Sequence, residues 1–312
     1  MRILMKSKAS ISLKEGFKEV LQFSVVKNLS KATLKNYRKN YEYFEKFYGS
    51  ERLLSEINDN TIRDYIIFLK ENFQLQSIES VNTCLRYLRA MVNYWIELGY
   101  VKRVKIRMLK GDVKIKDAYT DDELKILLKK PNIKKCSFPE YRTWVVINFF
   151  VGTGCRVRTL VNIKIQDIDL DNAVIKYSVT KNRKHQIVPI SKTLIKILDE
   201  YLKYRKGTQE DYAFCSETGT KLLETSVSHS VAKYNRKRGV SKTSVHLFRH
   251  TFAKGWILAG GDIFRLQKIL GHSSIEIVKE YVNMFTDDLK QNFDQYNPLE
   301  KVTTDKKTIK IK

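Results

Sequence analysis

The chain has 312 residues, 43% of them hydrophobic and 29% charged, which is typical of a folded protein of two domains and excludes a disordered tail. Its 58 lysines and arginines against 34 acidic residues give a formal charge of +24, and this surplus favours a polyanionic partner, nucleic acid first. The apolar runs are far shorter than the ~20 residues of a membrane span, and the N-terminus lacks a secretory signal, so we expect a cytoplasmic protein without a membrane partner.

Helical periodicity governs the chain from about residue 14 to residue 99. The clearest helices start at polar residues that can cap free backbone N–H groups, and they repeat apolar residues at three- and four-residue steps. They begin at Ser30, at Asn58 or Asn60, and near Ile78, and the first and third end at Gly49 and Gly99. The pattern predicts a small all-helical domain over residues 12–102.

The helical pattern fades in the basic stretch VKRVKIRMLKGDVKIKDAY. Such a charge run is either a connector that lies along DNA or a solvated linker, and we predict a basic interdomain linker over residues 103–118. Regular structure resumes with a capping box, in which Thr120 faces Glu123. Pro139 then opens a helix whose run WVVINFFV is apolar on every side. This run indicates the core of a second domain over residues 119–297.

Residues 171–190 change to the alternating apolar pattern of β-strands. Two short runs, 174–179 and 186–190, flank TKNRK, which predicts a hairpin with basic residues at its tip. Helices follow again, and residues 298–312 form a polar, basic C-terminal tail. The predicted fold class is therefore mainly α with a small β-sheet or hairpin in the second domain, an α+β arrangement.

The segment SVHLFRHTFAKGWILAGG reads as one helix ended by glycine. His246 and Arg249 lie three residues apart and so share a face. A lone histidine here also fits packing near the core, but a permanently charged Arg249 beside apolar residues needs an anion. His246 and His250 have the spacing of a zinc-binding helix, yet Leu247 stands where that motif needs its glutamate. We therefore predict no metal site.

Two glycine-containing turns carry the other candidates. An apolar helix ends at residues 152–154, and Arg156 follows at the start of the next helix, whose free amides favour an anion. In LGHSSIEIVKEYV, Gly271 ends a helix, His272 stands before the next one, and Tyr281 lies about two turns inside it. Taken alone, Tyr281 fits a core aromatic as well as a reactive group.

In chain order the sequence presents TGCR, a lysine at a hairpin tip, HLFRH, and LGH followed nine positions later by tyrosine. This set resembles the tyrosine recombinase family, of phage-integrase type, over about residues 14–296. The resemblance implies that the catalytic residues are Arg156, Lys181, His246, Arg249, His272 and the nucleophile Tyr281. The chain departs from the family in carrying Thr159 where an acidic residue is usual, and Lys184 rivals Lys181 at the hairpin tip.

The resemblance also implies a helical core-binding domain and a catalytic domain that together clamp double-stranded DNA at a specific recombination site. Tyr281 would attack a phosphodiester to give a 3′-phosphotyrosyl intermediate, and strand exchange would follow without cofactor or metal. The family acts as a homo-oligomer, a tetramer on paired sites, in integration, excision or resolution, so a mobile element, an accessory or excision factor and a nucleoid location are expected. The alternatives are a non-catalytic DNA-binding regulator of the same fold and a type IB topoisomerase that relaxes DNA.

Overall fold

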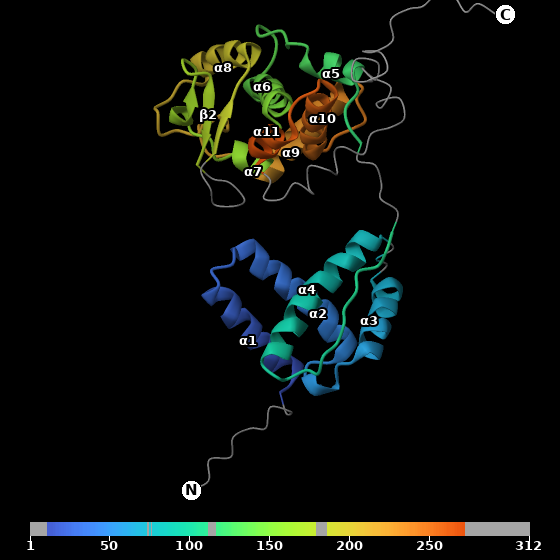
Figure 1. Cartoon of the computed structure of the whole chain (residues 1–312). Coiled ribbons are helices and arrows are strands. Elements are labelled where there is room, and N and C mark those ends of the chain that lie inside the picture. Colours follow the sequence, from blue (N-terminus) through green and yellow to red (C-terminus); the bar gives the residue numbers. More distant parts are fainter. Residues whose placement is uncertain (1–10, 74, 76, 112–116, 179–185, 272–312) are drawn as a thin grey trace, which may run out of the picture. The chain divides into compact units, whose positions relative to one another are not determined.

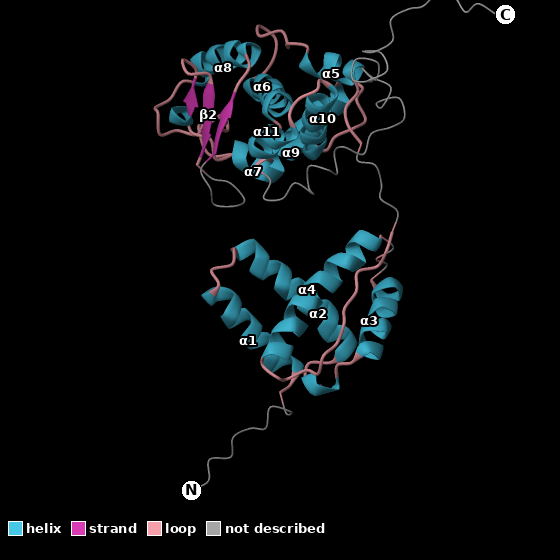
Figure 2. Ribbon diagram, viewed as in Figure 1, coloured by secondary structure: helices cyan, strands magenta, loops and turns pink. Residues whose placement is uncertain are grey.

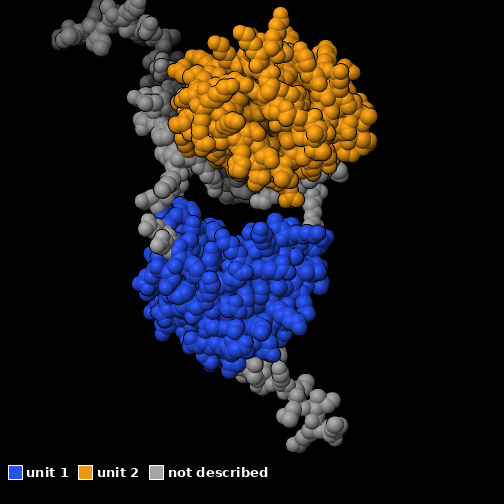
Figure 3. All heavy atoms as spheres, turned by 180° about the vertical axis from the view of Figure 1, so that it is seen from behind, with its two compact units in different colours: residues 1–113 blue, residues 114–312 orange. Residues whose placement is uncertain are grey.

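The computed structural model describes residues 11–73, 75, 77–111, 117–178 and 186–271. The chain divides into two compact units, Met1–Val113 and Lys114–Lys312 (Figure 3). Among the helices of the described ranges, none combines the length and apolar character that crossing a membrane requires. The two units are considered separately below.

The secondary-structure elements in the described part of the first unit are helices (Figure 1). Its helices are α1 (Leu13–Val26), α2 (Lys31–Tyr48), α3 (Asp59–Asn72) and α4 (Ile78–Glu97), with a short 3₁₀ helix η2 (Leu54–Glu56) between α2 and α3. Each α-helix begins at a side chain that accepts a backbone N–H bond, namely Ser12, Ser30, Asn58 and Ser77. Of the two candidate caps for α3, Asn58 is the one used, because its side chain accepts from the N–H groups of both Asn60 and Thr61.

Aromatic side chains fill the core of the first unit. Phe44 on α2 meets the ring of Tyr65 on α3 edge-on, with centroids 5.0 Å apart, and both are fully buried. Trp95 on α4 donates its indole N–H to the carbonyl of Gly16 on α1 at 3.0 Å. A Cβ atom on Gly16 would lie 2.4 Å from Leu54, so only glycine permits this close approach.

An extended segment follows α4 and packs on the first unit. Val104 and Ile106 are buried, whereas the lysines and arginines that alternate with them face solvent. The side chain of Asn82 on α4 donates to the carbonyl of Leu109 at 3.0 Å and accepts from its N–H at 2.8 Å. The first residues of the predicted linker over 103–118 thus pack on the core of the first unit. The limits of the linker stay a prediction.

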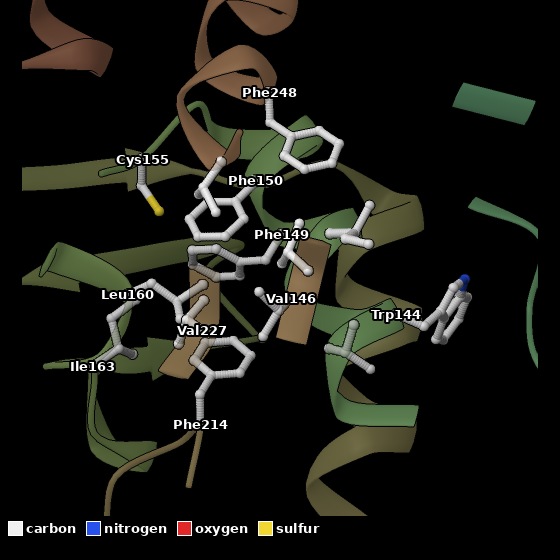
Figure 4. Packing of buried hydrophobic residues seen from close by; sticks show 14 of the residues in the cluster. Trp144, Val146, Phe149, Phe150, Cys155, Leu160, Ile163, Phe214, Val227 and Phe248 are labelled. Carbon is white, nitrogen blue, oxygen red and sulfur yellow. The ribbon is translucent and has the colours of Figure 1, made fainter. Parts of the chain in front are cut away.

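Helix α6 (Phe138–Thr153) is the central helix of the second unit and contacts α5, α8, α9 and α10. The helices around it are α5 (Asp121–Leu128), α7 (Val157–Leu160), α8 (Lys192–Arg205), α9 (Glu224–Lys237), α10 (Val245–Leu258) and α11 (Ile263–Leu270), with a 3₁₀ turn η3 (Ile165–Asp167). Phe149 and Phe150 on α6 lie in the middle of the core, and Phe150 neighbours Phe248 of α10 (Figure 4). The predicted burial of this run and the capping box of Thr120 with Glu123 are confirmed.

A small antiparallel sheet lies beside these helices (Figure 2). Its strands are β1 (Ile168–Asp169), β2 (Val174–Tyr177) and β3 (Gln186–Pro189), in the order β1-β2-β3. Ile175 pairs with Val188 in register, and both are buried. The predicted hairpin is confirmed for its strands, while its tip, residues 179–185, lies outside the described residues. The mainly helical fold class with a small sheet is confirmed.

Candidate active site

The turn after α6 places Arg156. The helix ends at Gly154, which has a left-handed backbone (φ 60°), and Arg156 is the residue from which α7 starts. A Cβ atom on Gly154 would lie 2.6 Å from Phe252 on α10 and 2.9 Å from Leu270 on α11. The glycine therefore lets α6 end against both helices, and the half-buried Arg156 reaches the carbonyl of Leu270, at 3.4 Å from Nη1.

Arg249 on α10 converges on the same carbonyl from another direction. Its side chain is buried, with 5% of the residue exposed. Nη1 donates to the carbonyl of Gly154 and Nη2 to the carbonyl of Leu270, both at 2.8 Å. Leu270 ends α11, and the negative end of a helix dipole stabilises a cation placed there. From the sequence we expected a negative partner for the charge of Arg249, and the end of α11 supplies part of it. The same helix end accepts hydrogen bonds from two guanidinium groups, those of Arg156 and Arg249.

The end of α11 is as predicted. Gly271 takes a left-handed conformation (φ 63°), and its N–H bonds back to the carbonyls of Gln267 and Lys268. Such a C-terminal glycine is the usual way to end a helix and turn the chain away. The described chain stops here, one residue before His272, so the predicted histidine follows directly on the turn that binds both arginines.

His246 stands in the first turn of α10, three residues before Arg249. The residue is exposed overall, but its imidazole is partly desolvated, and this together with the nearby charges of Arg249 and Arg156 lowers its pKa below the ordinary 6.5. A histidine with a lowered pKa is neutral near pH 7 and can accept a proton. The structure thus brings His246, Arg249 and Arg156 into one electrostatic environment.

The lowered pKa of His246 predicts a pH dependence of stability. The unfolded chain binds the proton more readily than the folded chain, so the free energy of unfolding should fall as the pH drops below 6.5. We expect wild type to lose stability relative to His246→Gln between pH 6.5 and pH 5, in urea unfolding experiments. The difference measured at pH 8, where the histidine is neutral in both states, gives the pH-independent effect of the substitution. A constant difference between pH 8 and pH 5 would contradict the shift.

Thr159 occupies the position where the family usually has an acid. It is buried, and its backbone N–H bonds to the carbonyl of Arg156 within the turn. The carbonyl of Leu270 offers Arg156 an acceptor from a different part of the chain. In the described ranges, histidine, cysteine, aspartate and glutamate side chains do not gather in threes that could hold a metal ion.

Sequence reasoning missed Gln186, the first residue of β3. Its side-chain amide donates to the carbonyls of Lys268 at 2.5 Å and Ile269 at 2.7 Å, in the last turn of α11. An alternating strand pattern reports only which side chains are buried, so no sequence signal marked this contact across 82 positions. Four proposed site residues, Lys181, its rival Lys184, His272 and Tyr281, lie outside the described residues, and their roles stay predictions.

The packing of Gly154 makes a stability prediction. An alanine there would strain the left-handed backbone, which costs ~1–2 kcal/mol, and would overlap Phe252 and Leu270, which adds ~1–3 kcal/mol. We expect Gly154→Ala to lower the free energy of unfolding by the sum of both effects in urea titration. Gly219→Ala is the matched control, because Gly219 also has a positive φ (80°) but open space around it. Equal losses in the two variants would contradict the close packing at Gly154.

Solved structures with this architecture include an XerA recombinase and a transposon integrase. The XerA chain is 25% identical, with a TM-score of 0.52, over 92% of this chain and 99% of that one. The Tn1549 transposon integrase, in complex with a circular intermediate DNA, is 18% identical with a TM-score of 0.75, over 92% of this chain and 100% of that one. At this lower identity the likeness concerns the fold, a helical N-terminal domain followed by a catalytic domain.

Relatives by sequence extend over almost the whole chain. Tyrosine recombinase XerC of Leptospira interrogans serogroup Icterohaemorrhagiae serovar copenhageni is 27% identical over 93% of this chain and 95% of its own length. Tyrosine recombinase XerD of Staphylococcus haemolyticus is 25% identical over 90% and 97%. Residues 12–111 match the phage integrase SAM-like domain, and residues 118–287, more than half of the chain, match the phage integrase family. The chain therefore belongs to the phage integrase family, that of the tyrosine recombinases.

Proposed function

We propose that the protein is a site-specific DNA recombinase that cuts and rejoins DNA through Tyr281. The observation that carries this proposal is the convergence of Arg156 and Arg249 on the carbonyl of Leu270, next to His272. A guanidinium group offers several N–H donors in one plane, and a phosphodiester is an anion whose two non-bridging oxygens such donors can bind.

The proposed reaction is a phosphoryl transfer to the tyrosine. The phenolic oxygen of Tyr281 attacks phosphorus while the bond to the 5′ oxygen breaks, and the phosphate stays joined to the 3′ end. Arg156 and Arg249 stabilise the charge that develops on the non-bridging oxygens. Because a phenol has a pKa of ~10, a histidine must accept or orient its proton, and we propose the neutral His246 or the other histidine of the proposed site, His272, for this role.

The leaving 5′ oxygen needs a proton, and Lys181 on the hairpin is our choice of general acid, with Lys184 as its rival. Rejoining reverses these steps: a 5′ hydroxyl of a partner strand attacks the 3′-phosphotyrosyl bond and releases the tyrosine. The phosphotyrosyl bond keeps the energy of the phosphodiester, so these reaction steps require no nucleotide or metal.

The first unit is proposed to hold the DNA. Helix α2 carries a series of exposed cationic residues, and such side chains bind phosphates and make affinity depend on salt. They are Lys31, Lys35, Arg38, Lys39 and Lys46. We propose domain limits of 12–102 and 119–297, assembly as a tetramer on two paired sites, a cytoplasmic location on the nucleoid and a role in a mobile element.

The test is the capture of a covalent protein–DNA adduct. Duplexes with a randomised central sequence and a nick beside it are incubated with the protein, because the short fragment released by cleavage diffuses away and leaves the adduct trapped. We expect an adduct on a denaturing gel, and mass spectrometry of the digested adduct should find the nucleotide on Tyr281. Sequencing of the trapped DNA then yields the recognition site.

The alternatives give different results in the same experiments. Tight and specific binding without any adduct would replace the proposal by a DNA-binding regulator. An adduct accompanied by relaxation of a supercoiled plasmid, with no exchange between two site-bearing molecules, would indicate a type IB topoisomerase.

A further inference from the structure

The last turn of α11 is a point where three parts of the second unit meet. A helix leaves its last four carbonyls without partners inside the helix. Here all four accept hydrogen bonds: Gln267 and Lys268 from the N–H of Gly271, Lys268 and Ile269 from the amide of Gln186, and Leu270 from Arg156 and Arg249. The sheet therefore contacts this turn through the side chain of Gln186.

Gln186 is also fitted closely to the end of the helix. The residue is half-buried, and its amide nitrogen reaches two consecutive carbonyls, at 2.5 Å from Lys268 and 2.7 Å from Ile269. Its amide oxygen lies 2.7 Å from the place where a Cβ atom on Gly271 would be. Gly271 thus combines a positive φ with close contact to the side chain of Gln186.

We propose that Gln186 is a positioning residue for the arginine pair, acting through the last turn of α11; this inference rests on the proposed function. The amide holds the carbonyls of Lys268 and Ile269, and the next carbonyl, Leu270, sets the positions of both guanidinium groups. A shift of about 1 Å at a reacting centre can cost about 10²-fold in rate. Loss of the hydrogen bonds from the Gln186 amide is therefore expected to slow cleavage, although we assign Gln186 no contact with DNA.

The variants separate the donor from the size of the side chain. Gln186→Glu keeps the shape but points a carboxylate at two carbonyl oxygens, and Gln186→Ala removes the donor without adding charge. Gln209→Glu is the matched control, because it makes the same change at an exposed residue of the same unit. We expect roughly 10²-fold slower single-turnover cleavage of the trapped duplex by both Gln186 variants, and wild-type rates for the control.

A second substrate distinguishes positioning of the arginines from general loss of structure. In a methylphosphonate linkage, a methyl group replaces one non-bridging oxygen and removes the negative charge on which guanidinium groups act. The ratio of wild-type to Gln186→Glu rates should therefore fall from roughly 10² towards one on methylphosphonate DNA. Thermal unfolding of each variant shows that the protein is folded at the assay temperature.

Each outcome bears on one of the two proposals. Equal ratios on phosphate and methylphosphonate DNA would overturn the inference, because the loss would then not pass through the arginines. Wild-type rates in both Gln186 variants would overturn it as well, with the recombinase proposal intact. Failure of the wild-type protein to form any adduct would overturn the proposed function, and the inference with it.

Discussion

Replacement of Tyr281 by phenylalanine is expected to abolish covalent attachment to DNA while binding to the same duplex stays nearly unchanged. The variant loses one oxygen, and that oxygen is the proposed nucleophile, so no other step can form the 3′-phosphotyrosyl bond. Binding is carried by many phosphate contacts to lysines and arginines and does not need the phenol. The measurement is adduct formation on the nicked duplex together with a gel-shift titration at fixed salt.

Tyr204→Phe is the matched control for this experiment. Tyr204 lies on α8 and is 51% exposed, so its hydroxyl can be removed without disturbing the core. We expect the control to form as much adduct as wild type. Adduct formation by the Tyr281→Phe protein would refute the assignment of the nucleophile and would require a different residue to carry the phosphoryl group.

Replacement of Arg249 by lysine is expected to slow cleavage by roughly 10²- to 10³-fold, the cost of losing one preorganised donor to a developing oxyanion. Lysine keeps the charge, but it cannot reproduce the planar fork that bonds the carbonyls of Gly154 and Leu270 together. The substitution should also shift Arg156, because both guanidinium groups donate to the carbonyl of Leu270. Single-turnover cleavage of the nicked duplex measures the effect.

Arg142→Lys tests whether any buried arginine would give the same loss. Arg142 on α6 is also buried, and its guanidinium donates to the carbonyl of Cys215, in another part of the unit. We expect this control to lose stability but to cleave at the wild-type rate at a temperature where it is folded. If Arg249→Lys cleaves at the rate of the control, Arg249 does not have the proposed role in the reaction.

The local features of the fold were predictable because each depends on a few neighbouring residues. Thr120 and Glu123 form a capping box wherever a helix starts between them, and a left-handed glycine such as Gly271 ends a helix by its backbone alone. The two-residue strand β1 carries too short a pattern to be recognised. Sequence reasoning missed the extended stretch with Val104 and Ile106. Its apolar residues recur every two positions, but they lie among many basic residues, and the stretch was interpreted from its charge alone.

The candidate site was predictable in its residue types and only partly in its geometry. His246 and Arg249 lie three apart on one helix, so their common face follows from the helical repeat. The contact from Arg156 to Leu270 joins residues 114 positions apart, and that from Gln186 to Lys268 joins residues 82 apart. Contacts at such separations depend on how helices and sheet pack, and no local spacing determines them.

The extended segment after α4 has a consequence for the energy of DNA binding. Val104 and Ile106 hold its backbone on the first unit, and the basic residues between and beside them, Lys105 and Arg107, are already in place on an ordered chain. Ordering a free residue costs about 1–2 kcal/mol of backbone conformational entropy, and here folding has met that cost before DNA arrives. A phosphate contact made by Lys105 or Arg107 therefore contributes more of its electrostatic energy to affinity than the same contact made by a flexible linker.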